Sequence, residues 1–236
     1  MTLFFTSHLS APLITLPPEE SKHCVKVLRM APGEEVYLTD GCGTLCRCRI
    51  LVADAKACEL EVVQRLENYG QRPHRLHIAV APTKNNARLE WFVEKAVEIG
   101  IDEITPLLCD HSERTSLHLE RLDKIVVAAM KQSLKAYKPL LHEPTRMVDL
   151  VAQASLRPQA RFICHCEGNE RATLHNMYDG HSDALVLIGP EGDFSPREIN
   201  AALQQGFQPI TLGPSRLRTE TAALYATVAL NFMMDK

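Results

Sequence analysis

The sequence predicts an α/β protein with a largely parallel sheet, preceded by a small β-rich domain. Residues 1–70 contain short strand-like runs separated by turn signals. From Leu76 onward, apolar strand-like runs alternate with segments of helical periodicity, which is typical of a parallel sheet. The polar segment ENYGQRPHR separates the two patterns. We therefore expect one domain at 1–70 and a second at 71–236.

Length and composition narrow the class of protein further. The chain has 236 residues, of which 45% are hydrophobic and 23% charged, so disordered and collagen-like classes are excluded. Lys and Arg total 26 against 29 Asp and Glu, a net charge of −3, so a nucleic acid would have to bind a local basic patch. No run has the length of a signal peptide core or a membrane span, so we expect a cytoplasmic protein.

The first 70 residues predict a β-hairpin, a third strand and a short helix. VYLTD and TLCRCRILVA flank Asp40-Gly41, a dipeptide that tolerates the positive φ of a tight turn. ACELEVVQRL alternates apolar and charged residues and predicts the third strand. SKHCVKVLRM predicts an amphipathic helix whose Val25, Leu28 and Met30 face inward.

The second segment predicts strands and helices in alternation. LHIAVAP, ITPLLC, RFICHC and ALVLIG are the expected strands. NNARLEWFVEKAVEIG predicts a helix capped by Asn85 or Asn86 and ended by Gly100, with apolar residues at helical spacing. A longer helix is expected in SLHLERLDKIVVAAMKQSLKAY, stopped by Pro139. Trp91 is expected in the core.

Two loops stand out as candidate ligand sites. In ALVLIGPEGDFSPREI a buried strand ends in Gly-Pro-Glu-Gly, and a helix follows with Ser195 as N-cap and Glu198 completing a capping box. In FQPITLGPSRLRTETAAL a strand again ends in Gly-Pro and a helix follows a basic loop. Ligands of open α/β sheets bind at the carboxyl ends of strands, so we expect both loops at one cleft. An ordinary βα turn also explains the glycines and prolines.

Several cofactor and metal classes find no support in the sequence. No Walker A or Gly-x-Gly-x-x-Gly motif occurs, which disfavours nucleoside triphosphates and nicotinamide cofactors. The eight cysteines include no Cys-x-x-Cys pair and are expected to be reduced thiols. Cys164 and Cys166 flank His165 on an expected strand, which would point the two sulfurs to one face and the imidazole to the other, so a zinc site is not favoured there. The histidines have no His-x-x-x-His or Glu-x-x-His spacing, so we predict no metal site.

The two loops together resemble the signature of the RsmE family, ribosomal RNA uracil-N3 methyltransferases of the SPOUT superfamily. The likeness extends through KHCVKVLRM, KAVEIGIDEITPL and AAMKQSLKAYKP, and so covers nearly the whole chain. It implies a PUA-like RNA-binding β-barrel in front and a SPOUT domain with a C-terminal trefoil knot. Asp193, where many members have glycine, and KQSLKAYKP depart from the commoner pattern. We expect Gly192 to turn the loop instead.

The resemblance also implies a cofactor, a substrate and an assembly. The cofactor is S-adenosyl-L-methionine, and the acceptor is N3 of a uridine in 16S ribosomal RNA, within the small subunit. The protein is expected to be a homodimer, because its final helix is apolar on more than one side. The implied cofactor-binding residues lie in three loops: His165, Cys166, Gly189, Pro190, Glu191, Gly192, Leu212, Gly213, Leu217, Arg218, Thr219, Thr221 and Ala222.

Methylation at N3 requires loss of a proton, and two side chains are candidates for assisting it. Glu220 is the candidate base, and Arg218 the group that stabilises charge on the uracil oxygens. A carboxylate in the first turn of a helix also has a purely structural explanation, and the proton can leave to water without a dedicated base. Arg218 can equally contact RNA phosphate.

Basic residues in both segments are candidates for RNA contacts, although each alone is an ordinary solvated charge. They are Arg29, Arg47, Arg88, Arg114 and Lys131. Two other functions remain open: a SPOUT methyltransferase acting on a ribose 2′-hydroxyl or on transfer RNA, and a non-enzymatic RNA-binding assembly factor.

Overall fold

The computed structural model describes residues 2–154, 156, 160–167 and 172–234. These residues form two compact units. The first runs to Arg72 and also contains Val127–Lys138, and the second contains Pro73–Val126 and the chain from Pro139 onward. No helix in the described part of the chain has the length and apolar character needed to cross a membrane.

The first unit is built on a five-stranded sheet in the order β1-β3-β4-β5-β2. Its strands are β1 (Leu3–Phe5), β2 (Leu13–Thr15), β3 (Glu35–Thr39), β4 (Leu45–Val52) and β5 (Glu59–Leu66). The predicted hairpin is confirmed as the antiparallel pair β3 and β4. Asp40 fixes its turn, because its Oδ1 accepts hydrogen bonds from the backbone of Cys42 at 2.7 Å and Thr44 at 3.1 Å. The predicted third strand is β5.

The predicted helix in this unit is two short pieces. An α-helix, α1 (Pro18–Lys22), continues into a π-helical turn, η1 (His23–Val27), in which the Leu28 amide bonds the His23 carbonyl five residues back. The wider turn rotates the later side chains away from the positions of a regular α-helix. The inward position predicted for Leu28 is therefore wrong: Leu28 is 41% exposed, and Cys24 is fully buried instead.

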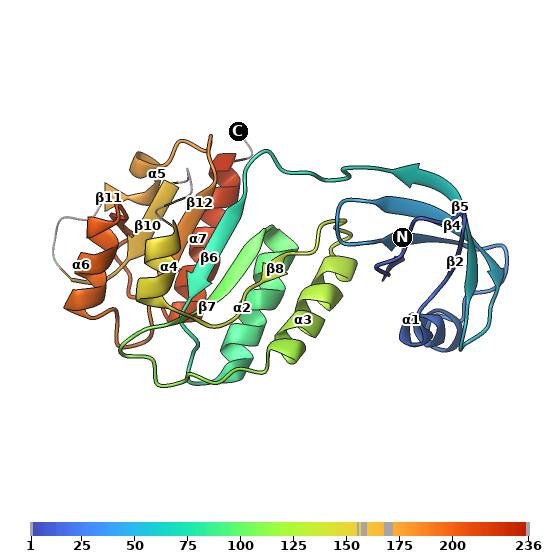
Figure 1. Cartoon of the computed structure of the whole chain (residues 1–236), viewed down its shortest axis with the longest axis horizontal. Coiled ribbons are helices and arrows are strands. Elements are labelled where there is room, and N and C mark those ends of the chain that lie inside the picture. The colour runs from blue at the N-terminus through green and yellow to red at the C-terminus, as the bar shows by residue number, and fades with distance from the viewer. Residues whose placement is uncertain (1, 155, 157–159, 168–171, 235–236) are drawn as a thin grey trace. The chain divides into compact units, whose positions relative to one another are not determined.

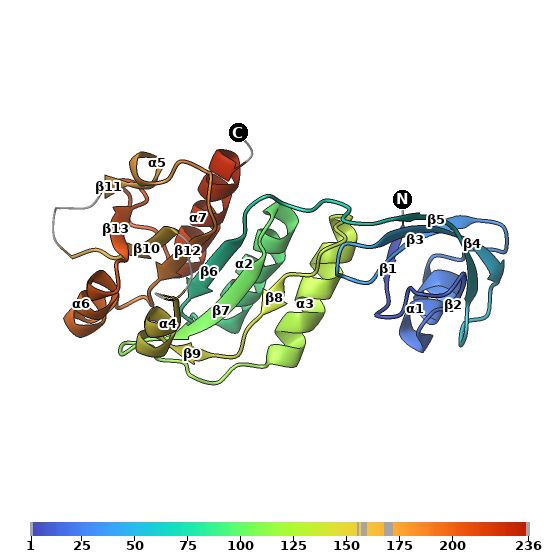
Figure 2. The same cartoon turned by 45° about the horizontal axis from the view of Figure 1, so that its top comes forward.

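The second unit contains a parallel sheet in the order β11-β13-β10-β12-β6-β7-β8, with β9 also paired to β7 (Figure 2). Its strands are β6 (Leu76–Val80), β7 (Glu103–Leu108), β8 (Leu140–Leu141), β9 (Thr145–Arg146), β10 (Ala160–Cys164), β11 (Ala172–Thr173), β12 (Ala184–Ile188) and β13 (Gln208–Thr211). Every pairing recorded between them is parallel. The predicted sheet type is thus confirmed.

Helices cover both faces of this sheet (Figure 1). The helices around it are α2 (Asn86–Ile99), α4 (Met147–Ala154), α5 (Leu174–Met177), α6 (Pro196–Gln204) and α7 (Thr219–Met234). The helix α3 (Leu119–Gln132) begins in this unit and ends in the first, which contains the chain from Val127 to Lys138. α2 packs on α7, which lies against β6, while α4 and α6 contact each other over a core that includes Leu187, Phe194 and Phe207. The helices pack on the faces of the sheet, and loops lie at the carboxyl ends of the strands.

The helix predictions are confirmed for α2 and only in part for α3. Asn85 caps α2 by accepting the Ala87 amide, and the apolar residues predicted inward are all buried. Trp91 is 44% exposed, so its expected place in the core is wrong, because it lies outside the buried stripe of the helix. α3 ends at Gln132 and does not reach Pro139: Leu134 has a left-handed φ of 57°, which breaks the helix.

Candidate functional site

Three loops leave the second unit's sheet side by side at its carboxyl edge. They follow β10, β12 and β13, and β10 lies between the other two strands. Cys164, the last residue of β10, is in register with Ile188 on one side and Ile210 on the other. The three chains therefore enter their loops at the same level of the sheet, where α/β proteins bind ligands.

Hydrogen bonds connect the three loops directly. The Thr219 hydroxyl, at the start of α7, donates to the Gly189 carbonyl at 3.1 Å, which joins the loop after β13 to the loop after β12. The backbone amide of Cys166 donates to Asp193 Oδ2 at 2.7 Å, which joins the loop after β10 to the loop after β12. The Gly-Pro loops thus meet as the sequence predicts.

Each residue predicted to bind the cofactor lies on one of these loops or on the first turn of α7. The first loop carries His165 and Cys166, the second Gly189, Pro190, Glu191 and Gly192, and the third, with α7, Leu212, Gly213, Leu217, Arg218, Thr219, Thr221 and Ala222. Gly213 has a φ of 117° and nothing within 4 Å of where a Cβ would stand, so the backbone there faces open space. Leu212, Leu217 and Ala222 are partly buried and keep accessible apolar surface.

Asp193 is a site residue that the sequence analysis undervalued. Its φ is 62°. The expected turn at Gly192 is confirmed, because the Asp193 amide bonds the Pro190 carbonyl at 3.0 Å and closes a turn over Glu191 and Gly192. Besides holding Cys166, the Asp193 carboxylate accepts the Phe194 amide at 2.8 Å. The His111 ring lies alongside, with Nδ1 3.1 Å from the carbonyls of both Gly192 and Asp193. A Cβ at Gly192 would meet His111 Cβ at 3.4 Å, an ordinary contact.

The start of α6 is fixed by the predicted capping box and by Asp110. Ser195 and Glu198 form the reciprocal bonds of the box. Asp110 Oδ2 accepts the Ser195 hydroxyl at 2.6 Å, and Arg197 lies 2.8 Å from Oδ1. The hydrogen bond from Ser195, followed by that from Arg197, lowers the pKa of Asp110. These contacts anchor the loop after β7 to the loop that carries Asp193.

Glu220 is a buried carboxylate next to the loop junction. Its side chain is 9% exposed, and its Oε1 lies 3.7 Å from Nε of Arg88 on α2. Oε2 is buried and has no hydrogen-bond partner among the described residues. Arg218, two residues earlier, is exposed. Arg88, which the sequence suggested as an RNA contact, therefore pairs with the candidate base.

The remaining candidate RNA contacts divide into paired and exposed side chains. Arg47 pairs with Glu35 at 3.3 Å, and Lys131 pairs with Glu20 at 2.5 Å. Arg29 is exposed on a left-handed turn, and Arg114 is partly exposed.

The cysteines flanking His165 differ in their surroundings. Burial raises the pKa of the Cys164 thiol, whereas Cys166 is exposed. The expected strand alternation, with both sulfurs on one face and the imidazole on the other, does not extend over these residues, because β10 ends at Cys164.

Comparison with known proteins identifies the family. A model of the RNA methyltransferase domain matches residues 70–231, and a model of the RNA methyltransferase PUA domain matches residues 16–63. Ribosomal RNA small subunit methyltransferase E of Mesomycoplasma hyopneumoniae is 33% identical over 171 residues, which cover 70% of this chain and 73% of the relative. The chain belongs to the ribosomal RNA small subunit methyltransferase E family.

Solved structures agree with this membership. A probable rRNA-methyltransferase from Porphyromonas gingivalis has a TM-score of 0.92 and 39% identity, over 100% of this chain and 99% of that one. The family's methyltransferase E from Neisseria gonorrhoeae, solved bound to S-adenosyl methionine, has a TM-score of 0.85 and 25% identity over 99% and 98% of the two chains. The predicted family, the RNA methyltransferase class and the PUA and SPOUT-type fold are confirmed, while the trefoil knot stays a prediction.

Proposed function

We propose that this protein transfers the methyl group of S-adenosyl-L-methionine to N3 of a uridine in 16S ribosomal RNA. Family membership supports RNA methylation as the class of reaction, and the surroundings of Glu220 support removal of the N3 proton. A uracil N3 carries a proton that must leave when the methyl group arrives. A buried carboxylate with one oxygen unbonded, beside three converging loops, is suited to accept it.

The three loops fit the cofactor. Accessible apolar surface on Leu212, Leu217 and Ala222 suits an adenine ring, and the open backbone at Gly213 suits contacts to its polar edge. The sulfonium of the cofactor supplies an activated methyl group. The remaining task of the protein is alignment of donor and acceptor, which can contribute roughly 7–11 kcal/mol to lowering the barrier.

The uracil must reach the site, and side chains of the protein then remove its N3 proton. N3 of a paired uracil lies inside the base stack, so the base must be single-stranded or flipped out. Glu220 Oε2 then takes the N3 proton, and Arg218, exposed next to it, stabilises negative charge that spreads onto the uracil oxygens. Arg88 Nε, 3.7 Å from Glu220 Oε1, orients the carboxylate from α2.

Replacement of Glu220 by glutamine tests this assignment. Glu220→Gln keeps the shape of the side chain but cannot accept the proton, so methyl transfer should fall on the order of 10²–10⁴-fold. Affinity for S-adenosylmethionine, measured by calorimetry, should stay within about threefold because the cofactor loops are intact. Glu120→Gln, an exposed carboxylate on α3 outside the three loops, is the matched control. Full activity of Glu220→Gln would remove Glu220 from the mechanism.

The two segments divide the work. The domain at 1–70 binds ribosomal RNA, and the domain at 71–236 binds the cofactor and catalyses transfer. Arg29 on the first domain and Arg114 contribute the local positive charge that the net charge of −3 does not, whereas Arg47 and Lys131 would first have to leave their partners Glu35 and Glu20. Arg29→Glu should weaken RNA binding and flatten its salt dependence while leaving cofactor affinity unchanged.

Assembly and location complete the proposal. Three large side chains on α7 are exposed, Tyr225 at 52%, Val228 at 47% and Phe232 at 73%. Such a surface favours contact with a second copy, and an obligate dimer buries roughly 2,000 Å² or more. We therefore expect a two-fold symmetric homodimer that acts on the small subunit in the cytoplasm.

A further inference from the structure

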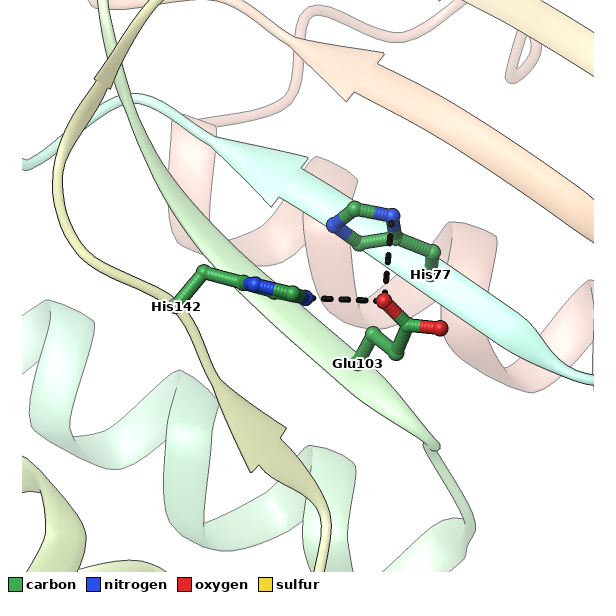
Figure 3. Close-up of side chains that lie close together, drawn as sticks. All are labelled: His77, Glu103 and His142. Atoms are coloured by element: carbon green, nitrogen blue, oxygen red, sulfur yellow. Dashed lines mark hydrogen bonds and ion pairs between the residues drawn. The ribbon is translucent and has the colours of Figure 1, made fainter. Parts of the chain in front are cut away.

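A second cluster of chemically active side chains lies in the second unit, away from the three loops. It consists of His77 on β6, Glu103 at the start of β7 and His142 directly after β8 (Figure 3). One ligand atom from each residue lies within 4.8 Å of the other two. Both His77 and Glu103 have side chains only 8% exposed, and His142 is 30% exposed. We propose that this cluster binds a divalent transition metal ion of the zinc type.

The donor set and its spacing suit that ion. Two imidazole nitrogens and one carboxylate oxygen, with a fourth position open to water, are a known ligand set for zinc. Glu103 Oε2 lies 2.8 Å from His142 Nε2 and 3.9 Å from His77 Nδ1. Ligand atoms around tetrahedral zinc are about 3.3 Å apart, given bonds of ~2.0–2.1 Å. These two separations differ from this by about half an ångström, and all three ligand atoms lie within 4.8 Å of one another, so side-chain rotation would bring them to the distances around zinc.

Neighbouring groups orient the ligands as outer partners of metal sites do. His77 Nε2 lies 2.7 Å from the Thr105 hydroxyl, and this hydrogen bond holds the ring with Nδ1 directed toward Glu103. With an ion bound at Nδ1, the ring proton would lie on Nε2 and be donated to that hydroxyl. Nη1 of Arg75 lies 3.8 Å from the other oxygen, Oε1, of Glu103. The backbone amide of His142 bonds the Ile104 carbonyl at 2.9 Å, which fixes that residue against β7.

Metal binding requires one proton to move. Without metal, His142 Nε2 donates its proton to the Glu103 carboxylate. A bound ion would take the place of that proton. The proton would then move to Nδ1 of the His142 ring, and the Nε2 lone pair would bind the ion. The partly exposed His142 side gives the ion a path from solvent.

The position of the cluster indicates a structural role. His77 and Glu103 lie at the amino ends of their strands, whereas the three loops follow carboxyl ends, and the strands are parallel. The ion would link β6, β7 and the segment after β8, a strand of two residues at the edge of the sheet. It would therefore stabilise this edge without taking part in methyl transfer.

Zinc titration of the full chain after treatment with chelator tests the proposal. We expect one saturable site by calorimetry and a melting temperature that rises with zinc concentration. Cobalt(II) should give the absorption of a nitrogen and oxygen site without thiolate charge-transfer bands, which separates this cluster from the exposed Cys42 and Cys166. His142→Asn, which alters a half-exposed side chain, should weaken zinc binding at least ~100-fold.

Matched variants make the result decisive. Thr105→Val removes the hydroxyl that bonds His77 Nε2 and should weaken zinc binding roughly 10–100-fold. His175→Asn, an exposed histidine outside the cluster, should leave it unchanged. Absence of a saturable site in the unaltered protein, or equal zinc affinity in His142→Asn, would show that the three residues form a hydrogen-bonded network only.

Discussion

Asp193 offers a sharp test of how the cofactor loops are held. Its carboxylate bonds the Cys166 amide at 2.7 Å across two loops and the Phe194 amide at 2.8 Å within its own loop. Its φ of 62° is a backbone conformation that glycine adopts freely and alanine does not. Asp193→Ala removes both bonds and keeps the strain, whereas Asp193→Gly removes both bonds and relieves it.

The expected magnitudes follow from these contacts. A hydrogen bond to a charged acceptor contributes about 1.5–3 kcal/mol, and the lower value applies because Asp193 is partly exposed. Loss of the bond to Cys166 separates the two loops, so cofactor affinity should fall about tenfold in both variants, since 1.4 kcal/mol corresponds to a factor of ten. The free energy of unfolding should fall by about 1 kcal/mol more in Asp193→Ala than in Asp193→Gly.

Calorimetry with S-adenosylmethionine measures the first effect and urea unfolding the second. Glu143→Ala, which removes an exposed carboxylate elsewhere in the second unit, is the control and should change neither quantity. Wild-type cofactor affinity in both Asp193 variants would refute the idea that this carboxylate connects the loops. Equal stability of the two variants would refute the assigned strain.

Three further predictions concern stability and assembly. Ser195→Ala removes the cap of α6 and should lower the free energy of unfolding by about 1 kcal/mol in urea; no change would contradict the role of the capping box. The pKa of Asp110 is lowered from 3.8 by Ser195 and Arg197, so its stabilisation is complete above that value and is lost as the pH falls through the lowered pKa. Asp110→Asn should therefore reduce the difference between the free energies of unfolding measured with urea at neutral pH and at strongly acidic pH. An unchanged difference would contradict this. Phe232→Asp should shift the protein toward a 26.4 kDa monomer in sedimentation equilibrium, whereas a monomeric unaltered protein would refute the dimer.

The features that could be predicted from the sequence are those with local causes. The capping box of α6, the Asn85 cap of α2 and the Asp40-Gly41 hairpin each depend on residues within a few positions of one another. The buried stripe of α2 follows from helical periodicity. The meeting of the two Gly-Pro loops follows because parallel strands present their carboxyl ends at one edge.

The features that were missed depend on contacts distant in sequence. Residues 127–138 group with the first unit through contacts such as the hydrogen bond from Thr39 to the Ala136 carbonyl, 97 positions away. The pairing of Arg88 with Glu220 and the cluster at His77 join separate strands and helices, so no local spacing encodes them. The role of Asp193 was missed for the same reason, because its hydrogen bond from the Cys166 amide joins two loops that are 27 positions apart.

The most direct test of the central claim is nucleoside analysis of 16S ribosomal RNA from cells that lack this protein. N3-methyluridine should be absent from one position, return with the unaltered protein, and stay absent with a stably expressed Glu220→Gln variant. An unchanged N3-methyluridine content would contradict the account. Loss of a 2′-O-methyl nucleoside instead, or of a modified nucleoside in transfer RNA, would also contradict it.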